Sequence, residues 1–295
     1  MTTSTATKKR VNRKPKPGVY EDIRFDVYAS WPYVNNSLLN HATRSAAHFQ
    51  EARDNPKYQD TPSMRFGRLV DAIASNDLRT VGVISGAEWL DLKNRYSRPT
   101  STRQWDYMAG KIRKNQGVVD VYTEDEVFAA NRIWKLVIDG PAGRLVDGAK
   151  RQVCLVWDDP TTGIRCKSRL DFLSTFGVVD LKTSYDVSQF RMSILRFGYH
   201  RQMAFYRRGW SLVGDGELHA THLIAAETRE PFGNMAAPLS ARLIAKGEEE
   251  IDVALARIAR AVDKEQWDGY ASPQEWDIPV GETVTVWIDG EEREW

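Results

Sequence analysis

The sequence predicts a mixed α/β (α+β) domain whose central sheet is mainly antiparallel and flanked by helices. Three observations predict this class: helical patterns fill the first half of the chain, a meander of strand patterns follows residue 150, and further helices then surround one more strand. A chain of 295 residues is long for one domain and short for three. We interpret residues 18–295 as a single domain, with a helical part over 18–150, a core over about 151–265 and a C-terminal extension.

Composition excludes several classes of protein. Hydrophobic residues make up 42% of the chain and charged residues 27%, which is ordinary for a globular protein. We find no apolar run near the ~18 residues that span a bilayer, and no apolar stretch of a secretory signal after the basic start. The two cysteines, Cys154 and Cys166, are too few for a disulfide scaffold. A reduced, cytoplasmic setting fits best.

Charge is unevenly distributed along the chain. The 41 basic and 40 acidic residues nearly cancel, so the total charge indicates no particular partner. Residues 1–17, by contrast, contain six lysines and arginines, no acid, and the prolines Pro15 and Pro17. Such a segment cannot bury a core, so we expect a disordered basic arm that either contacts a polyanion or is simply solvated.

Capping signals predict three helices before residue 140. Each starts with a residue whose side chain can accept a hydrogen bond from the first turn, followed by apolar residues at helical spacing. The third is expected to end at Gly140-Pro141. The expected starts are Asn36 or Ser37, Asp60-Thr61-Pro62-Ser63, and Thr123 with Asp125 and Glu126. The first helix is expected to continue as one element that carries Leu38, Leu39, Ala42, Ala46 and Phe49.

Residues 93–114 combine seven basic residues with one acid, Asp106, and with the aromatics Tyr96, Trp105 and Tyr107. As a loop or arch, this segment could hold a DNA strand by charge and by stacking. A solvated linker between helices is the alternative.

Strand patterns dominate after residue 150. In residues 164–173, alternation places Arg165, Lys167, Arg169 and Asp171 on one face. The other expected elements are strands over 151–157, 176–184 and 217–228, a turn over 158–163, helices from 187 to 206, a helix from Ser240, and a final strand with an Asp289-Gly290 turn.

Two carboxylates in neighbouring strands are the main candidates for chemistry. A short connection makes 164–173 and 176–184 a hairpin, so Asp171 and Asp180 can face each other across it. Facing carboxylates repel unless a cation joins them, and Mg²⁺ or Mn²⁺ prefers such oxygen ligands. Lys182 points to the same side as Asp180, and the carbonyl of Leu181 is a plausible further ligand. A surface ion pair is the alternative, but an apolar strand favours paired or functional charges.

The following helices favour a phosphodiester substrate. Residues 187–210 contain five arginines and no acid, and Gln202 and Tyr206 share a helical face. An exposed basic helix with Tyr206 in the core is the alternative. The residues expected to contact DNA are Arg191, Arg196, His200, Arg201 and Arg207.

Together, Asp171, Asp180-Leu181-Lys182 and Gln202-x-x-x-Tyr206 resemble the PD-(D/E)XK nuclease superfamily. The resemblance is closest to the exonuclease VIII (RecE-type) branch of phage and prophage exonucleases, which implies a restriction-endonuclease-like core. It covers roughly residues 20–210. Similar stretches are WPYVNNSLLNHATRSAAHFQ (31–50), TPSMRFGRLVDAI (61–73) and YHRQMAFY (199–206).

The resemblance implies a Mg²⁺-dependent exodeoxyribonuclease that digests double-stranded DNA ends 5′ to 3′ in phage-type recombination, inside a bacterial host cell. Asp171, Asp180 and the Leu181 carbonyl would bind the metal, and Lys182 would be the catalytic lysine. Gln202 and Tyr206 would position DNA near the cleaved bond. The resemblance also implies a homo-oligomeric ring and a single-strand annealing protein as partner, and no membrane.

The sequence departs from the family pattern at two positions. Leu170 stands where the family name has proline, which does no chemistry. Asp71 stands where the branch usually has a metal-binding histidine; it either replaces that ligand or is an ordinary exposed helix residue. Rival functions are another nuclease of the superfamily (an endonuclease or a single-strand exonuclease), a catalytically inactive DNA-binding module, and a structural protein of a phage or mobile element.

Overall fold

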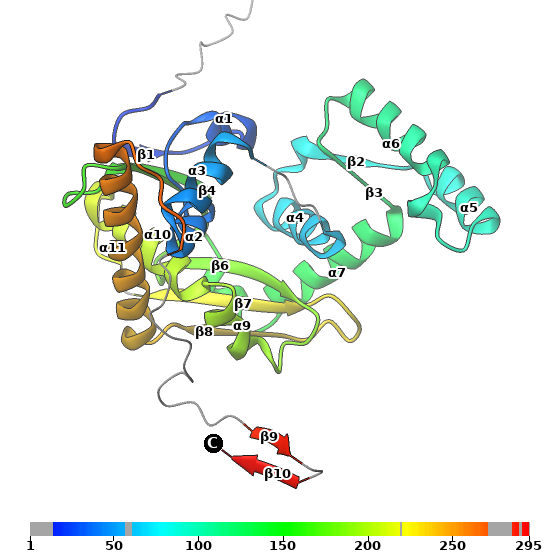
Figure 1. The fold of residues 1–295 in the computed structure, drawn as a ribbon. Helices are drawn as coiled ribbons and strands as arrows, with labels where there is room; N and C mark the ends of the chain where they lie inside the picture. Colours follow the sequence, from blue (N-terminus) through cyan, green and yellow to red (C-terminus); the bar gives the residue numbers. More distant parts are fainter. Residues whose placement is uncertain (1–13, 57–60, 219, 271–284, 289–290, 295) are drawn as a thin grey trace, which may run out of the picture.

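The computed structural model describes residues 14–56, 61–218, 220–270, 285–288 and 291–294 (Figure 1). The first 13 residues of the predicted arm and the predicted Asp289-Gly290 turn lie outside this part. Within the arm, the Pro15 carbonyl accepts a hydrogen bond from the Tyr33 hydroxyl at 2.9 Å. Its last residues therefore already contact the domain.

A mixed, mainly antiparallel sheet forms the centre of the fold, as the sequence predicts, and it has six strands. Its strands pair antiparallel throughout, except for β6 and β7, which are parallel. A parallel pair needs a crossover, and two helices supply it: α9 (Phe190–Arg196) and α10 (Tyr199–Val213). In order across the sheet the strands are β1 (Gly18–Tyr20), β4 (Lys150–Asp158), β5 (Arg165–Ser174), β6 (Gly177–Ser184), β7 (Thr221–Glu227) and β8 (Asn234–Pro238).

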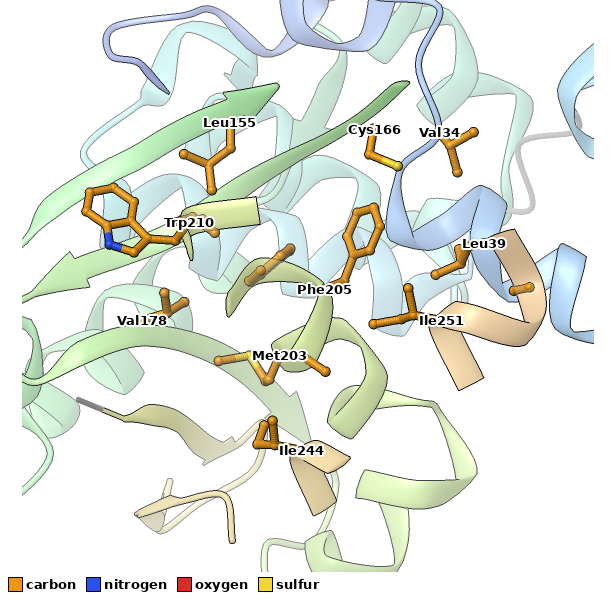
Figure 2. Packing of buried hydrophobic residues seen from close by; sticks show 14 of the residues in the cluster. Val34, Leu39, Leu155, Cys166, Val178, Met203, Phe205, Trp210, Ile244 and Ile251 are labelled. Carbon is orange, nitrogen blue, oxygen red and sulfur yellow. The ribbon is translucent and has the colours of Figure 1, made fainter. Parts of the chain in front are cut away.

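Helices cover both faces of this sheet. On one face, α2 (Asn36–Arg44), α10 and α11 (Ala241–Lys264) form the larger core, in which Phe205 and Met203 meet side chains of the strands (Figure 2). On the other face lie α4 (Pro62–Ser75), α7 (Glu124–Asp139) and α8 (Gly143–Val146). In the described part of the chain, none of the helices is long and apolar enough to span a bilayer.

Capping residues explain where these helices start. Thr61 caps α4, Ser240 caps α11, and Thr123 forms a capping box with Glu126 at α7, as predicted. The first helix was predicted wrongly in two respects. Its cap is Asn35, and the chain breaks at Ser45, whose side chain caps a separate helix, α3 (Ala46–Asp54).

The predicted alternation holds in β6 and fails in β5. Val178 packs in the core on the α10 face, while Val179 and Leu181 pack on the α4 face. In β5, Leu170 lies in the α10-side core but Phe172 lies in the α4-side core. The regular alternation is therefore interrupted at the residue between them, Asp171.

A backbone distortion in β4 accompanies this interruption. Gln152 has φ of 55°, and the β4–β5 ladder runs from Arg151↔Phe172 to Val153↔Leu170 without a pair between them. The residues left out of the ladder are Gln152 and Asp171. The sheet is thus irregular at the point where a predicted site residue stands.

Residues 81–122 form a small lobe that projects beside the sheet (Figure 1). We name it the helical lobe. The predicted loop or arch over 93–114 is wrong, because most of this segment is helical and Trp105 packs into a local core with Ile84 and Leu92. The lobe consists of β2 (Val81–Val83), α5 (Gly86–Arg95), the 3₁₀ turn η2 (Pro99–Ser101), α6 (Arg103–Gln116) and β3 (Asp120–Tyr122), with β2 and β3 parallel.

Short elements complete the fold. The helix α1 (Phe25–Ser30) packs over β1 and β4 through an aromatic cluster that includes Tyr28 and Trp31. A 3₁₀ turn, η1 (Leu78–Thr80), joins α4 to the lobe. At the end of the chain, β9 (Thr285–Ile288) and β10 (Glu291–Glu294) pair antiparallel, where the sequence predicts a strand.

Candidate active site

Beyond their last paired residues β5 and β6 diverge, and we call this point the fork. The two predicted carboxylates lie together there. The β5–β6 ladder ends at Phe172↔Val179, and the same register places Asp171 opposite Asp180 one step further. There Oδ2 of Asp171 accepts a hydrogen bond from the backbone N–H of Leu181 at 3.1 Å, in place of a ladder bond. The hairpin predicted from the sequence therefore puts both carboxylates at one point.

Asp180 is the most deeply buried member of the site, with no exposed surface. Its Oδ1 accepts a hydrogen bond from Nε2 of Gln202 at 3.1 Å. Its Oδ2 forms an ion pair with Nζ of Lys182, the next residue on the same face of β6. Asp180 and Lys182 are thus paired within an apolar strand, as expected because a buried charge is costly unless it has a partner of opposite charge.

The helix α10 supplies the polar residues that face this pair. Nε2 of Gln202 lies 2.7 Å from the hydroxyl of Tyr206, so the two share a helical face as predicted. Tyr199, which we did not predict as a site residue, lies with its ring centroid 5.2 Å from Nζ of Lys182. Its role could have been predicted from the sequence, because Tyr199 lies at the start of α10, one helical turn before Gln202 and two turns before Tyr206.

Asp71 reaches the site from α4. Its Oδ1 accepts a hydrogen bond at 2.9 Å from Nε2 of Gln152, the residue at the distortion in β4. Its side chain is partly buried, and its charge acts on Asp171. Asp71 is therefore no ordinary exposed helix residue. Gln152 was missed, because it follows Lys150 and Arg151 at the polar start of β4 and nothing in the sequence sets it apart from them.

Burial and like charge together shift the pKa values of these groups. Burial raises the pKa of Asp171 well above its ordinary value, and the charges of Asp180 and Asp71 raise it further. Burial also raises the pKa of Asp71. For Lys182, burial favours the neutral form, but Asp180 and Asp171 outweigh it and the pKa of the amine is raised. The ammonium of Lys182 therefore keeps its proton at neutral pH.

The donor set fits a hard divalent cation. Asp71, Asp171 and Asp180 offer carboxylate oxygens, and the buried Oδ2 of Asp180 has the Lys182 ammonium as its partner. Three neighbouring carboxylates face two cations, the Lys182 ammonium and the Arg169 guanidinium that acts on Asp71, and this leaves an excess of negative charge that a further cation would relieve. As the side chains stand, no three histidine, cysteine, aspartate or glutamate groups in the described part converge as a metal site. The charge of the Asp180 carboxylate is balanced by the Lys182 ammonium.

Comparison with known proteins identifies the family. A family model described as a PDDEXK-like domain of unknown function (DUF3799) matches residues 36–275. The chain belongs to this family. No curated protein matches it.

A solved structure shows the same PDDEXK-like fold. A crystal structure from Eubacterium rectale, described as a "Putative exonuclease", aligns with a TM-score of 0.57 at 12% sequence identity, covering 85% of this chain and 90% of that chain. A structure of SSO0001 aligns over 73% of this chain and 84% of that chain at 14% identity, but its TM-score of 0.26 is too low to bear on the fold. The family and the fold support a nuclease; the RecE-type branch stays a prediction.

The basic residues predicted to contact DNA divide into two groups in this PDDEXK-like domain. Arg191, Arg196 and Arg207 are exposed and remain available. His200 and Arg201 do not, because both side chains turn toward Glu250 of α11. His200 is only 2% exposed. These two residues hold α10 against α11, and we withdraw them as expected DNA contacts.

Proposed function

We propose that this protein is a metal-dependent deoxyribonuclease that hydrolyses phosphodiester bonds. The observation that carries the proposal is the convergence of Asp171, Asp180 and Lys182 at the fork between β5 and β6. Gln202 of α10 donates to this cluster from a separate element. A buried group of carboxylates beside a protonated amine suits divalent cations and a phosphate ester better than it suits a structural role.

The chain's own residues have distinct roles in this proposal. Asp171 and Asp180, with Asp71 and the carbonyl of Leu181, would hold the cation, which supplies Lewis-acid activation when bound. The Lys182 ammonium stays protonated and stabilises negative charge on the phosphate. Gln202 orients the Asp180 carboxylate, and Tyr206 orients Gln202. In the net reaction, a water oxygen forms a new bond to phosphorus, the bond to the leaving sugar oxygen breaks, and that oxygen takes a proton.

The finer assignment rests on the sequence resemblance. It specifies Mg²⁺ or Mn²⁺, double-stranded DNA ends as substrate, 5′ to 3′ digestion, and a role in phage-type recombination inside a bacterial cell. It also includes a homo-oligomeric ring and a single-strand annealing partner. The exposed Arg191 and Arg196 on α9, which links Lys182 to Gln202 along the chain, support DNA as the substrate.

Digestion of end-labelled linear duplex tests this function. We expect cleavage with Mg²⁺ or Mn²⁺ and none in EDTA, and a covalently closed circle should be spared. Asp180→Ala should lose both metal binding and cleavage. Cleavage of the closed circle would instead indicate an endonuclease. Cleavage that persists in EDTA would contradict the proposed chemistry.

A catalytically inactive DNA-binding module is the second candidate. The Lys182–Asp180 ion pair favours it, because the amine already neutralises the carboxylate without a cation. Isothermal titration with Mn²⁺ separates the two functions. The nuclease should bind Mn²⁺ and release protons as its carboxylates ionise, whereas the inactive module should bind DNA but neither bind Mn²⁺ nor cleave.

A further inference from the structure

The helical lobe contains a segment with a clear excess of positive charge. Residues 93–116 contain seven basic residues and one acidic residue, which leaves 34 basic and 39 acidic residues elsewhere. The remaining chain is thus net negative, although its proposed substrate is a polyanion. Net negative charge repels DNA at long range, so positive charge must be presented locally if DNA is to be held.

One face of α6 presents this charge outward. The inner face of the helix packs Trp105 and Ala109 into the core of the lobe. The opposite stripe, at spacings of four, seven and eleven residues, carries Arg103, Tyr107, Gly110 and Lys114. Tyr107 is 69% exposed. From Arg103 to Lys114 the stripe is about 16 Å long.

Arg103 and Lys114 on this stripe, and Lys111 beside it on the side that faces α5, form no ion pairs within the lobe. Earlier in the segment, Lys93 pairs with Asp125 and Arg95 with Asp91. By contrast, none of the carboxylates in residues 61–218 lies in ion-pair contact with Arg103, Lys111 or Lys114, and all three are exposed. The nearby acids are Asp106 on the flank of α6, and Glu88 and Asp91, which line a cavity between α5 and α6 together with Tyr107 and Lys111.

We propose that the outward face of α6 is a second DNA-binding surface, which holds the phosphate backbone of a duplex outside the active site. Arg103, Lys111 and Lys114 would contact phosphates, and the exposed Tyr107 would donate its hydroxyl to the same backbone. Gly110 leaves room at the middle of the stripe, because a side chain there would meet nothing within 4 Å. Such contacts carry no sequence preference. The inference rests on the proposed function for the identity of the ligand.

The lobe is firmly attached to the active site. Arg68 of α4 forms a bidentate ion pair with Asp120 of β3, in which Nε lies 2.8 Å from Oδ2 and Nη2 lies 3.0 Å from Oδ1. The hydroxyl of Tyr122 donates to the carbonyl of Arg65 at 2.9 Å. The same helix carries Asp71 into the site. DNA held on α6 would therefore be held at a fixed distance from the carboxylates.

Fluorescence anisotropy with a labelled 30-base-pair duplex, without divalent metal, tests the surface independently of cleavage. The triple variant Arg103→Ala/Lys111→Ala/Lys114→Ala should bind several-fold more weakly, with the slope of log K against log salt reduced by about 3. Alanine favours helix, so the lobe should keep its fold. The matched control removes three exposed cations of α11, on the far side of the molecule (Figure 1): Arg242→Ala/Arg260→Ala/Lys264→Ala.

The control should bind like the wild type. A charge-keeping variant, Arg103→Lys/Lys111→Arg/Lys114→Arg, should also bind DNA normally. Unchanged affinity in the alanine triple variant, or an equal loss in the α11 control, would overturn the proposed surface. If the wild type binds through α6 but never cleaves with Mg²⁺ or Mn²⁺, the nuclease assignment fails while this surface stands. If the alanine triple variant cleaves and binds DNA like the wild type, the proposed surface on α6 fails while the nuclease assignment stands.

Discussion

Gln202 of α10 and Asp180 of β6 are joined by a 3.1 Å hydrogen bond, from Nε2 to Oδ1. The bond links the crossover helix to the strand that carries the lysine of the site. Since Asp180 is fully buried, this donor and the Lys182 ammonium together determine how its carboxylate is oriented.

Gln202→Leu should impair catalysis more than DNA binding. Leucine removes the donor to Oδ1 of Asp180 at similar volume, and a buried acceptor left unpaired costs about 1–3 kcal/mol. We expect kcat/KM on linear duplex to fall by at least about tenfold, and the thermal midpoint to fall as well. Gln116→Leu, at the exposed end of α6, is the control. Wild-type cleavage by Gln202→Leu would contradict the positioning role.

Lys182→Ala should retain DNA binding and lose cleavage. The ammonium is the cation that meets Oδ2 of Asp180, and loss of one such electrostatic donor typically lowers kcat by about 10²–10³. Single-turnover cleavage and anisotropy on the same duplex separate the two effects. Lys182→Met, which keeps the aliphatic stem, should fail to cleave in the same way. Normal cleavage by either variant would refute the catalytic assignment.

Asp171→Asn should stabilise the metal-free protein while abolishing activity. Burial and the neighbouring carboxylates of Asp180 and Asp71 raise the pKa of Asp171, so its charged form is unfavourable in the folded state. The amide oxygen can still accept from the N–H of Leu181. Thermal unfolding in EDTA at pH 7 should therefore show a higher midpoint than the wild type. A lower midpoint would mean that the carboxylate charge stabilises the fold.

Asp71→Asn should weaken cation binding without unfolding the protein. The amide keeps a hydrogen-bonding partner for Gln152 but removes one negative charge from the site. We expect Mn²⁺ affinity measured by calorimetry to fall by about 10–100-fold. Asp139→Asn, which removes the exposed partner of Lys135 on α7, serves as the control. Equal Mn²⁺ affinity in Asp71→Asn and the wild type would exclude Asp71 as a ligand.

Lys167→Met should destabilise the domain and change its pH dependence. Nζ of Lys167 is buried and donates to the carbonyls of Tyr28 and Trp31 at 2.8 and 2.7 Å. Leaving these acceptors unpaired should cost about 1–3 kcal/mol at pH 7. Burial lowers the pKa of Lys167 to about 8, so the unfolded chain binds more protons between pH 8 and about 10.4.

Wild-type stability should contain a term that rises over this pH range, and Lys167→Met should lack it. Urea midpoints at pH 7 and pH 9.5 measure the difference. Lys150→Met, which removes an exposed lysine paired with Glu21, should match the wild type at both values. An identical pH response in Lys167→Met would show that the lysine does not titrate in this range.

Local signals in the sequence were sufficient for most of the central fold. Alternating strands and side-chain caps act within a few residues, so β4 to β7 and the starts of α4, α7 and α11 could be predicted. The strand β8 could not, because Asn234–Pro238 has little β-branched or aromatic character and gains its place by pairing with β7. The helix α6 did carry a signal, in Trp105, Met108, Ala109 and Ile112, which the density of charge obscured.

The juxtaposition of the candidate site residues could be predicted where they are close in sequence. Asp171, Asp180 and Lys182 lie within one hairpin, and Gln202 and Tyr206 within one helix. The fate of His200 could not be predicted, because its partner Glu250 is 50 residues away on α11. The contact of Gln152 with Asp71 depends in the same way on how α4 packs against a distorted strand. Such long-range pairs follow from tertiary packing and leave no periodic pattern.

Close packing between α4 and β6 limits how the lobe can move. A Cβ at Gly67 would lie 3.1 Å from Oγ1 of Thr183, so little free space separates helix and strand at that level. Gly67 and Asp71 are one helical turn apart on α4. The contact between α4 and β6 therefore leaves no flexible joint at this level. A tilt of the lobe about its base would change the spacing between Asp71 and the carboxylate of Asp180 on β6.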